Sequence, residues 1–225
     1  MSKQEKLSKP RGDQDSAHSH PEASKHGAEP GHHHHGQGHK FDPANLEKLR
    51  DPERLQWQNP EALWRAIGAK PDAVVVDVGA GIGFFSLPFA RLAPQGWVYA
   101  CDILPVMLEY LRKGMEHEKV PNITPVLCGE VKVPLPSGLA DVVLMVNLHH
   151  EFHKPVDSLS EARRVLKSGG VLAAVDWKKM ETPHGPPQGV RVETDTVKKH
   201  LKASGFRDFT EHDILPHHWF LTARV

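Results

Sequence analysis

The sequence predicts an α/β fold with a doubly wound, mostly parallel β-sheet and helices on both of its faces. Between residues 73 and 205, short runs rich in Val, Leu and Ile alternate with longer amphipathic runs. Two strand-like runs follow, at 206–215 and 217–225, and only a short turn at Leu215-Pro216 separates them. The alternation is typical of parallel strands with crossover helices, whereas so short a turn permits only an antiparallel C-terminal hairpin.

The individual elements follow from residue type and period. Runs dominated by β-branched and other apolar residues predict five strands, at 73–79, 97–102, 123–128, 140–147 and 170–177. Apolar residues with a helical period predict four helices, at 84–92, 104–117, 155–167 and 193–205.

Two further segments precede the sheet. Residues 1–40 are rich in Ser, Lys, Glu, Gly, Pro and His and hold almost no large apolar side chains, which predicts a disordered tail. Residues 41–72 contain three Asp-Pro or Asn-Pro dipeptides, each a helix start, and predict an N-terminal helical cap. The α/β domain would then occupy 73–225.

Composition restricts the partners. Lys plus Arg equals Asp plus Glu at 28 each, so no overall field attracts nucleic acid or an anionic membrane, and a small-molecule partner is favoured. No stretch approaches the roughly 18 apolar residues of a membrane span, and the first thirty residues hold no apolar export signal. Two cysteines in apolar runs suit a reducing compartment, so the expected location is the cytoplasm. The oligomeric state stays open.

The strongest local pattern is the glycine-rich segment VVVDVGAGIG at 74–83, where an apolar strand ends in a turn that opens a helix. Gly79 and Gly81 can adopt backbone angles closed to other residues and leave room for a ligand, and Gly83 lets the helix begin close to the strand. A dinucleotide fingerprint GxGxxG would need glycine at 84, where this chain has Phe84. The pattern therefore disfavours an NAD-dependent oxidoreductase.

Two carboxylates refine the choice of ligand. Asp77 just before the turn would repel a diphosphate but attract a ligand carrying an amino group and a sulfonium, which favours S-adenosylmethionine. Asp102 ends the next strand 23 residues beyond Gly79, where a carboxylate can accept hydrogen bonds from both ribose hydroxyls.

Four stretches, in this order, then carry a resemblance to a known family: DVGAGIGFFS, ACDILPVMLEYLR, CGEVKVPLPSGLADVVLMVNLHHEF and EARRVLKSGGVLAAVDW. In these stretches the chain resembles the class I S-adenosylmethionine-dependent methyltransferases, and is similar to the ubiquinone and menaquinone biosynthesis branch. The likeness covers roughly residues 57–225. It implies a Rossmann-like domain at 73–225, S-adenosyl-L-methionine as the cofactor, and methyl transfer to a small molecule.

The resemblance also assigns cofactor-binding residues at the strand ends: Asp77, Gly79, Ala80, Gly81, Gly83, Asp102, Ile103, Gly129, Glu130, Asn147 and Leu148. It places the methionine part of the cofactor beside Asp77, Gly79 and Gly81. The ribose would lie beside Asp102, and the adenine ring beside Ile103.

Two further assignments come from the later strands. Glu130 would face the adenine amino group, although the family usually has Asp after the glycine and Glu is one methylene longer. Asn147 and Leu148 would lie beside the sulfonium.

Methyl transfer from a sulfonium is a displacement in which the protein mainly aligns the nucleophile, and a base is needed only for weakly acidic acceptors. The candidate bases His149, His150 and His153 follow the fourth strand, and Glu151 could orient one of the rings. The alternative interpretation is that one or two of these histidines have a structural role at the start of a helix.

Three neighbouring segments point to the same region. Asp176 and Trp177 close the fifth strand at the same edge of the sheet, and Trp177 also suits the core. The proline-rich segment 180–189 predicts a stiff loop over the acceptor site. The cap, with Arg54 and Trp57 among its residues, could cover the pocket or simply anchor to the sheet.

An alternative function rests on the tail. The run His32, His33, His34 and His35 could bind divalent Zn, Ni or Cu through imidazole, in a metal-handling or regulatory protein that keeps a cofactor-binding methyltransferase fold. That reading predicts metal binding without turnover. A flexible tail, however, offers no preformed geometry for a metal.

Overall fold

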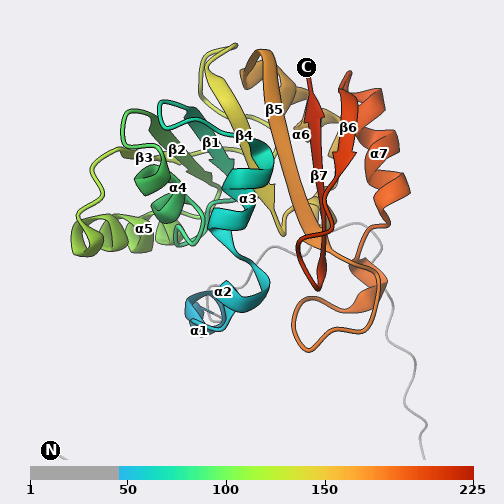
Figure 1. Ribbon diagram of the computed structural model, residues 1–225, viewed down its shortest axis with the longest axis horizontal. Coiled ribbons are helices and arrows are strands. Elements are labelled where there is room, and N and C mark those ends of the chain that lie inside the picture. The colour runs from blue at the N-terminus through green and yellow to red at the C-terminus, as the bar shows by residue number, and fades with distance from the viewer. Residues whose placement is uncertain (1–45) are drawn as a thin grey trace, which may run out of the picture. The chain divides into compact units, whose positions relative to one another are not determined.

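The computed structural model describes residues 46–225, apart from the side chains of residues 47 and 48, and in this range it forms one seven-stranded sheet (Figure 1). The strands are β1 (Val74–Val78), β2 (Trp97–Asp102), β3 (Ile123–Leu127), β4 (Ala140–Val146), β5 (Leu166–Trp177), β6 (Arg207–Glu211) and β7 (His218–Arg224). The α-helices are α1 (Leu46–Arg50), α2 (Arg54–Trp57), α3 (Pro60–Ile67), α4 (Ser86–Leu92), α5 (Pro105–Glu118), α6 (Pro155–Val165) and α7 (Thr194–Ala203). Two 3-10 turns, η2 (His149–Glu151) and η3 (Gln188–Val190), complete the described elements.

The strand order is β3-β2-β1-β4-β5-β7-β6. Strands β1 to β5 pair in parallel, whereas β7 pairs antiparallel with both β5 and β6. The predicted doubly wound sheet with a C-terminal antiparallel hairpin is confirmed. The winding direction reverses between β1 and β4, and in open α/β sheets such a reversal opens a crevice at the carboxyl ends of the strands.

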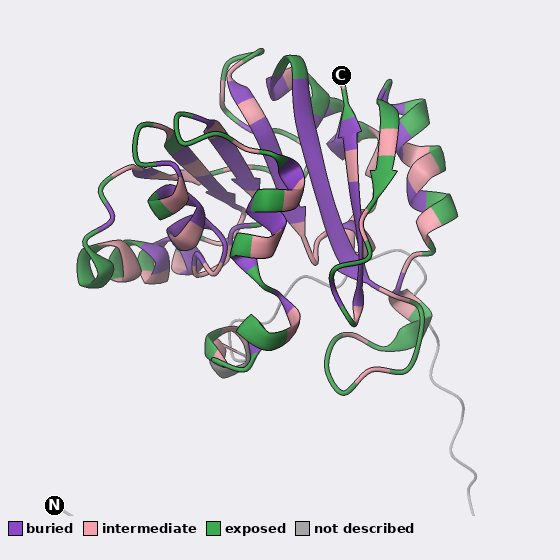
Figure 2. Ribbon diagram, in the orientation of Figure 1, coloured by how far each residue is buried: buried purple, intermediate pink, exposed green. Residues whose placement is uncertain are grey.

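Alternation along the strands separates two cores. Val75 and Val76 are both fully buried but belong to different clusters, because successive side chains of a strand point to opposite faces. Helices α3, α4 and α5 cover the face that carries Val75, and α6 and α7 cover the other. Figure 2 shows the central strands buried along most of their length. Each fully buried Val or Leu stabilises the fold by about 1.5–3 kcal/mol.

The largest differences from the predicted boundaries are at two strand ends, each displaced by four residues. Strand β5 begins at Leu166 rather than 170, because Leu166 pairs with Ala140 on β4 and ends α6 at Val165. Strand β6 ends at Glu211 rather than 215, since Leu215 turns inward and is buried in the core with Phe220. At Leu166 pairing with β4 overrides the predicted helix, and at Leu215 burial in the core overrides the local β-propensity.

The segment before the sheet contains three short helices. Asn59 caps α3, accepting a hydrogen bond from the Ala62 amide at 3.0 Å, and Gly68 ends the helix with a φ of 70°. Leu63 and Trp64 bury that helix against the core. Residues 41–45 and the predicted tail 1–40, including the proposed metal ligands at 32–35, lie outside the described residues.

None of the helices between residues 46 and 225 combines the length and the apolar character required to cross a bilayer.

Candidate functional site

A cavity of about 760 Å³ opens at the carboxyl ends of the parallel strands. Its walls come from the glycine loop, from the residues after β2, β3 and β4, from α2 and from the loop at 183–190. Figure 1 shows α2 and the long loop between β5 and α7 below these strand ends. The cavity therefore lies at the crevice that the strand order produces.

The glycine loop presents bare backbone to this cavity. Gly79 and Gly81 have φ values of 76° and 55°, in the left-handed region where a side chain is strained. A Cβ atom added at Gly79 would come within 3.0 Å of Leu148. The amides of Gly79 and Ala80 both donate to the Cys101 carbonyl, at 2.9 and 3.0 Å, which ties the loop to β2.

Asp102 is almost completely buried and holds the loop from the other side. One carboxylate oxygen accepts from the Gly81 amide at 2.8 Å, and the other accepts from the Leu104 amide at 2.9 Å. Burial raises the pKa of Asp102, and the backbone hydrogen bonds oppose that shift. Each oxygen keeps acceptor capacity, because a carboxylate offers about four lone-pair sites. This geometry fits a ribose diol.

Asp77 and Asn147 provide polar acceptors at the methionine end of the expected site. The Asp77 carboxylate accepts from the Ser86 hydroxyl at 2.5 Å, and burial raises the pKa of Asp77 to about 7. Asn147 has a φ of 54°, and its buried side-chain oxygen has no hydrogen-bond partner among the described residues. An unpaired buried acceptor is costly, so both groups suit a ligand that donates, such as an ammonium.

The loop after β3 brings Gly129 and Glu130 to the cavity, with Ile103 and Leu148 among the other lining residues. The carboxylate of Glu130 lies 3.7 Å from Nε2 of His153. Of the eleven residues that the resemblance assigns to the cofactor, all except Gly83 line the cavity. A Cβ at Gly83 would instead clash with Leu111 on α5, so this glycine serves helix packing.

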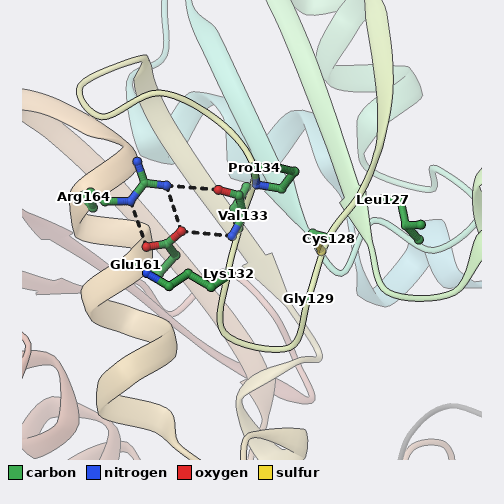
Figure 3. Close-up of a pocket in the computed structure, with 8 residues that line it drawn as sticks. All are labelled: Leu127, Cys128, Gly129, Lys132, Val133, Pro134, Glu161 and Arg164. Carbon is green, nitrogen blue, oxygen red and sulfur yellow. Dashed lines mark hydrogen bonds and ion pairs between the residues drawn. The ribbon is translucent and has the colours of Figure 1, made fainter.

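A second cavity of about 500 Å³ shares Cys128 and Gly129 with the first (Figure 3). Beside it, Glu161 and Arg164 of α6 hold the loop after β3. The Glu161 carboxylate accepts from the Val133 amide at 3.0 Å and from the Arg164 guanidinium at 2.8 Å. Arg164 also donates to the carbonyls of Val133 and Leu135, at 3.0 and 2.9 Å. This pair therefore anchors the loop that carries Glu130.

His150 is the candidate base that the structure places best. Its Nδ1 lies 2.9 Å from a carboxylate oxygen of Asp176, and its backbone amide donates to the same carboxylate at 3.0 Å. Nε2 lies 3.9 Å from Glu151, a residue that also lines the cavity. Burial lowers the pKa of His150, but the hydrogen bond to Asp176 and the charges of Asp176 and Glu151 outweigh it and raise the pKa overall. Asp176, rather than the expected Glu151, orients the ring.

The other two candidate histidines differ from His150. His149 does not line the cavity: its Nε2 lies 3.1 Å from Nδ1 of His200, and its ring packs on Phe152 and Trp219. Burial lowers the pKa of His149 to about 4, so the structure gives this residue a packing role. His153 lies at the cavity beside Glu130.

The acceptor side of the cavity has an aromatic wall. Trp57 stacks on His184 at 5.2 Å between ring centroids and packs on Trp177 at 5.4 Å. Arg191 holds the loop with His184 by donating to the carbonyls of Lys178, Met180, His184 and Pro186. Its guanidinium also lies over the Trp177 ring, 5.3 Å from the centroid. The sequence predicted a wall here, but showed no signal for the role of Arg191.

Among the side chains that the structure describes, no group of three or more His, Cys, Asp or Glu residues is arranged to hold a metal ion. The histidines at 32–35 lie outside the described residues, so their proposed metal binding stays a prediction.

The chain is similar to several known proteins. A family model described as a methyltransferase domain matches residues 76–174. The "Ubiquinone/menaquinone biosynthesis C-methyltransferase UbiE" of Cupriavidus taiwanensis is 34% identical over 129 residues, covering 54% of this chain and 52% of the relative. The "tRNA(Phe) (4-demethylwyosine(37)-C(7)) aminocarboxypropyltransferase" of Methanocaldococcus jannaschii is 32% identical over 125 residues, covering 54% and 48%. The chain thus matches about half the length of these curated relatives.

A solved structure matches over a greater length. The crystal structure of a SAM dependent methyltransferase from Aquifex aeolicus is 32% identical and superposes with a TM-score of 0.79, covering 82% of this chain and 98% of the other.

Proposed function

The chain belongs to the S-adenosylmethionine-dependent methyltransferases, and from that premise we propose that it methylates a small-molecule acceptor bound beside His150. The observation that carries the proposal is one continuous cavity: the glycine loop and Asp102 line it together with His150 and the aromatic wall. S-adenosylmethionine is the cofactor of this family and supplies an activated methyl group on a sulfonium.

We assign the cofactor's polar groups to the strand ends. Asp102 accepts hydrogen bonds from the ribose hydroxyls, and Asp77 with the unpaired oxygen of Asn147 faces the ammonium. Glu130 faces the adenine amino group from the loop after β3. Gly79, Ala80 and Gly81 leave the space that the methionine part requires, and Leu148 packs against Gly79.

His150 acts as the base in this proposal. Asp176 accepts a hydrogen bond from Nδ1–H, so Nε2 carries the lone pair that takes a proton from the acceptor. Because the Asp176 carboxylate holds the pKa of His150 up, the ring is a stronger base than an isolated imidazole. A phenol, enol, hydroxyl or thiol that gives its proton to Nε2 would become the nucleophile for the methyl group. The bond between sulfur and the methyl carbon would break, and S-adenosylhomocysteine would leave with its electron pair.

The first test is calorimetric titration of S-adenosylhomocysteine into wild-type protein and into Asp102→Ala, with NAD as a control ligand. We expect micromolar binding of S-adenosylhomocysteine, weakened about 10- to 100-fold in the variant, because hydrogen bonds to a charged group contribute about 1.5–3 kcal/mol. No binding to wild-type protein, or a preference for NAD, removes the cofactor assignment.

The second test is methyl transfer from labelled cofactor to a panel of phenols, enols and thiols. We expect His150→Gln to lower kcat by about 10²- to 10⁴-fold, the usual contribution of a general base, with little change in cofactor affinity. His117→Gln is the matched control, because His117 is exposed on α5. Equal rates in wild-type protein and His150→Gln exclude His150 as the base.

A nucleic-acid acceptor is a second candidate, because one relative is described as acting on tRNA(Phe). Incubation of the protein with total tRNA and with cofactor labelled at the methyl or at the carboxyl carbon distinguishes the two outcomes. We expect no label in RNA. Methyl label in RNA would make tRNA the acceptor, and carboxyl label would show transfer of the aminocarboxypropyl group.

The metal-handling alternative predicts a different outcome. If the histidines at 32–35 carried the function, the protein would bind Zn²⁺ or Ni²⁺ tightly and would not turn over any acceptor. Turnover that survives removal of residues 1–40 and treatment with a chelator counts against that alternative. A cytoplasmic location stays a prediction from composition.

A further inference from the structure

The loop after β5, residues 178–190, forms part of the cavity wall but has little regular structure to hold its shape. Its one regular element is the 3-10 turn η3 at its end. Three prolines in the loop supply no backbone N–H group, and the loop residues are exposed or half-buried. Residues 183–187 and Val190 nevertheless line the cavity. A wall of this kind needs an anchor from outside the loop.

Arg191, directly after η3, provides that anchor and is only 6% exposed. Its Nε donates to the Pro186 carbonyl at 2.9 Å, and one terminal nitrogen donates to the carbonyls of Lys178 and Met180 at 3.0 and 2.8 Å. The other terminal nitrogen donates to the His184 carbonyl at 3.3 Å. These bonds use four of the five N–H groups of the guanidinium. The start, middle and end of the loop are thus held by one side chain.

The position of the loop in turn determines the aromatic wall. The His184 ring stacks on Trp57 of the cap, with 5.2 Å between centroids and 14° between planes. Gly185 lies so close to Trp177 that a Cβ atom there would come within 2.7 Å of the indole ring. The guanidinium of Arg191 lies 5.3 Å from the centroid of the same ring. Trp177 is therefore in contact both with the loop and with the side chain that anchors it.

Arg191 also places a positive charge near the proposed base. The charge acts on His150 through space and lowers its pKa, whereas Asp176 and Glu151 raise it. Asp176 accepts from Nδ1 of His150 at 2.9 Å, and Glu151 lies 3.9 Å from Nε2. The adjacent His149 is neutral near pH 7, because burial lowers its pKa to about 4. The charged groups around His150 thus come from β5, from η2 and from the anchor of the loop.

We propose that Arg191 is the positioning residue of the acceptor side: it shapes the loop at 178–190 into the wall that the methyl acceptor meets and keeps a positive charge beside that wall. This inference rests on the proposed function, which puts the acceptor in the same cavity. Arg191 does not line the cavity, so it acts through Trp177 and His184 and through its field. A fixed cation beside the site favours an acceptor that becomes anionic when it loses its proton.

A merely stabilising role for Arg191 makes a different prediction. If its hydrogen bonds only stabilised the fold, their loss would lower the midpoint of thermal unfolding and leave both the acceptor KM and the pKa of His150 unchanged. Two substitutions separate position from charge. Arg191→Met removes both, whereas Arg191→Lys keeps the charge but loses the planar fork that reaches four carbonyls.

The experiment compares full-length wild-type protein, Arg191→Met, Arg191→Lys and the control Arg224→Gln. Arg224 is exposed, donates to a single backbone carbonyl, that of Gly169 at 3.0 Å, and does not line the cavity. Kinetics use the phenol, enol or thiol that wild-type protein methylates fastest. Calorimetry gives the Kd of S-adenosylhomocysteine. NMR of labelled histidine follows the titration of His150, and hydrogen exchange follows the amides of the loop. Thermal unfolding reports whether each variant is folded.

We expect Arg191→Met to raise the acceptor KM about 10- to 100-fold, because the wall is no longer held in place, and to change the Kd of S-adenosylhomocysteine less than about threefold. The pKa of His150 should rise in Arg191→Met and stay near its wild-type value in Arg191→Lys. Arg191→Lys should still raise the KM, and the loop amides should exchange faster in both variants. Arg224→Gln should match wild-type protein.

An unchanged acceptor KM in folded Arg191→Met, or an equal loss of affinity for acceptor and S-adenosylhomocysteine, overturns the proposal. An unchanged pKa of His150 in that variant overturns the part assigned to the charge. If Arg191→Met does not fold, Arg191→Lys decides through its KM. If wild-type protein methylates no acceptor, the proposed function fails, whereas loop exchange and the titration of His150 still decide the role of Arg191.

Discussion

Replacing Arg164 by Met would test how the fold positions the adenine end of the cofactor site. Arg164 lies on α6 and donates to the carbonyls of Val133 and Leu135 and to the Ser137 hydroxyl, at 3.0, 2.9 and 3.1 Å. These acceptors belong to the loop that carries Gly129 and Glu130 into the cavity (Figure 3). The Met variant keeps the aliphatic stem but removes every anchor.

The magnitude follows from the number and exposure of the lost bonds. Three anchors at about 0.5–1.5 kcal/mol each would total about 1.5–4.5 kcal/mol if fully protected. The Arg164 side chain is 34% exposed, and solvent reduces this to about 1–2 kcal/mol in the free energy of unfolding. Binding must then order the loop, so we expect S-adenosylhomocysteine to bind about 3- to 10-fold more weakly.

The assay is calorimetric titration of S-adenosylhomocysteine, with the midpoint of thermal unfolding measured on the same samples. Arg163→Gln is the matched control, because Arg163 is an exposed neighbour on the same helix and donates to Gly205 rather than to the loop. The midpoint should fall by about 3–6 °C in Arg164→Met. Unchanged affinity in a folded Arg164→Met protein would refute the reasoning, because the loop would then hold its conformation without Arg164.

Three further predictions use other parts of the site. Burial raises the pKa of Asp77 to about 7, above its unfolded value of 3.8. The folded protein therefore tolerates the neutral carboxyl better than the charged one, and the stability associated with the neutral form is complete below pH 4 and is lost as the pH rises towards 7. In denaturant titrations, Asp77→Asn should therefore be more stable than wild-type protein at pH 8, by a few kcal/mol in order of magnitude, and equally stable near pH 4. Equal stability of the two proteins at pH 8 would contradict the raised pKa. Gly83→Ala should lower the free energy of unfolding by about 1–3 kcal/mol, because its Cβ meets Leu111 at a φ of 90°, and an unchanged denaturation midpoint would show that α5 can move away. Asp176→Asn should lower the pKa of His150, shift the acidic limb of the kcat profile to lower pH and reduce kcat about 10²- to 10⁴-fold; an unshifted limb would exclude His150 as the titrating base.

The difference between His149 and His150 illustrates the limit of sequence reasoning about the site. Both follow β4 and were equal candidates for the base, as was His153. The 3-10 turn at His149–Glu151 directs adjacent side chains to different sides, so His149 meets His200 in the interior while His150 meets Asp176 at the cavity. Asp176 is 26 residues away in sequence, and its carboxylate displaces Glu151 from the expected orienting role.

Local patterns in the sequence were sufficient to predict the succession of strands and helices along the chain, the C-terminal hairpin, and the glycine loop with Asp77 and Asp102. A hydrophobic period or a glycine spacing involves only a few neighbouring residues, so it can be recognised without knowing which distant residues they contact. Which side chains meet in the cavity depends instead on how distant segments pack together. Arg54 reaches Phe84 thirty residues on, and Arg164 anchors a loop about thirty residues before it, because helices packed against the sheet bring these segments together. No local period encodes such contacts, since the folding of the whole chain creates them.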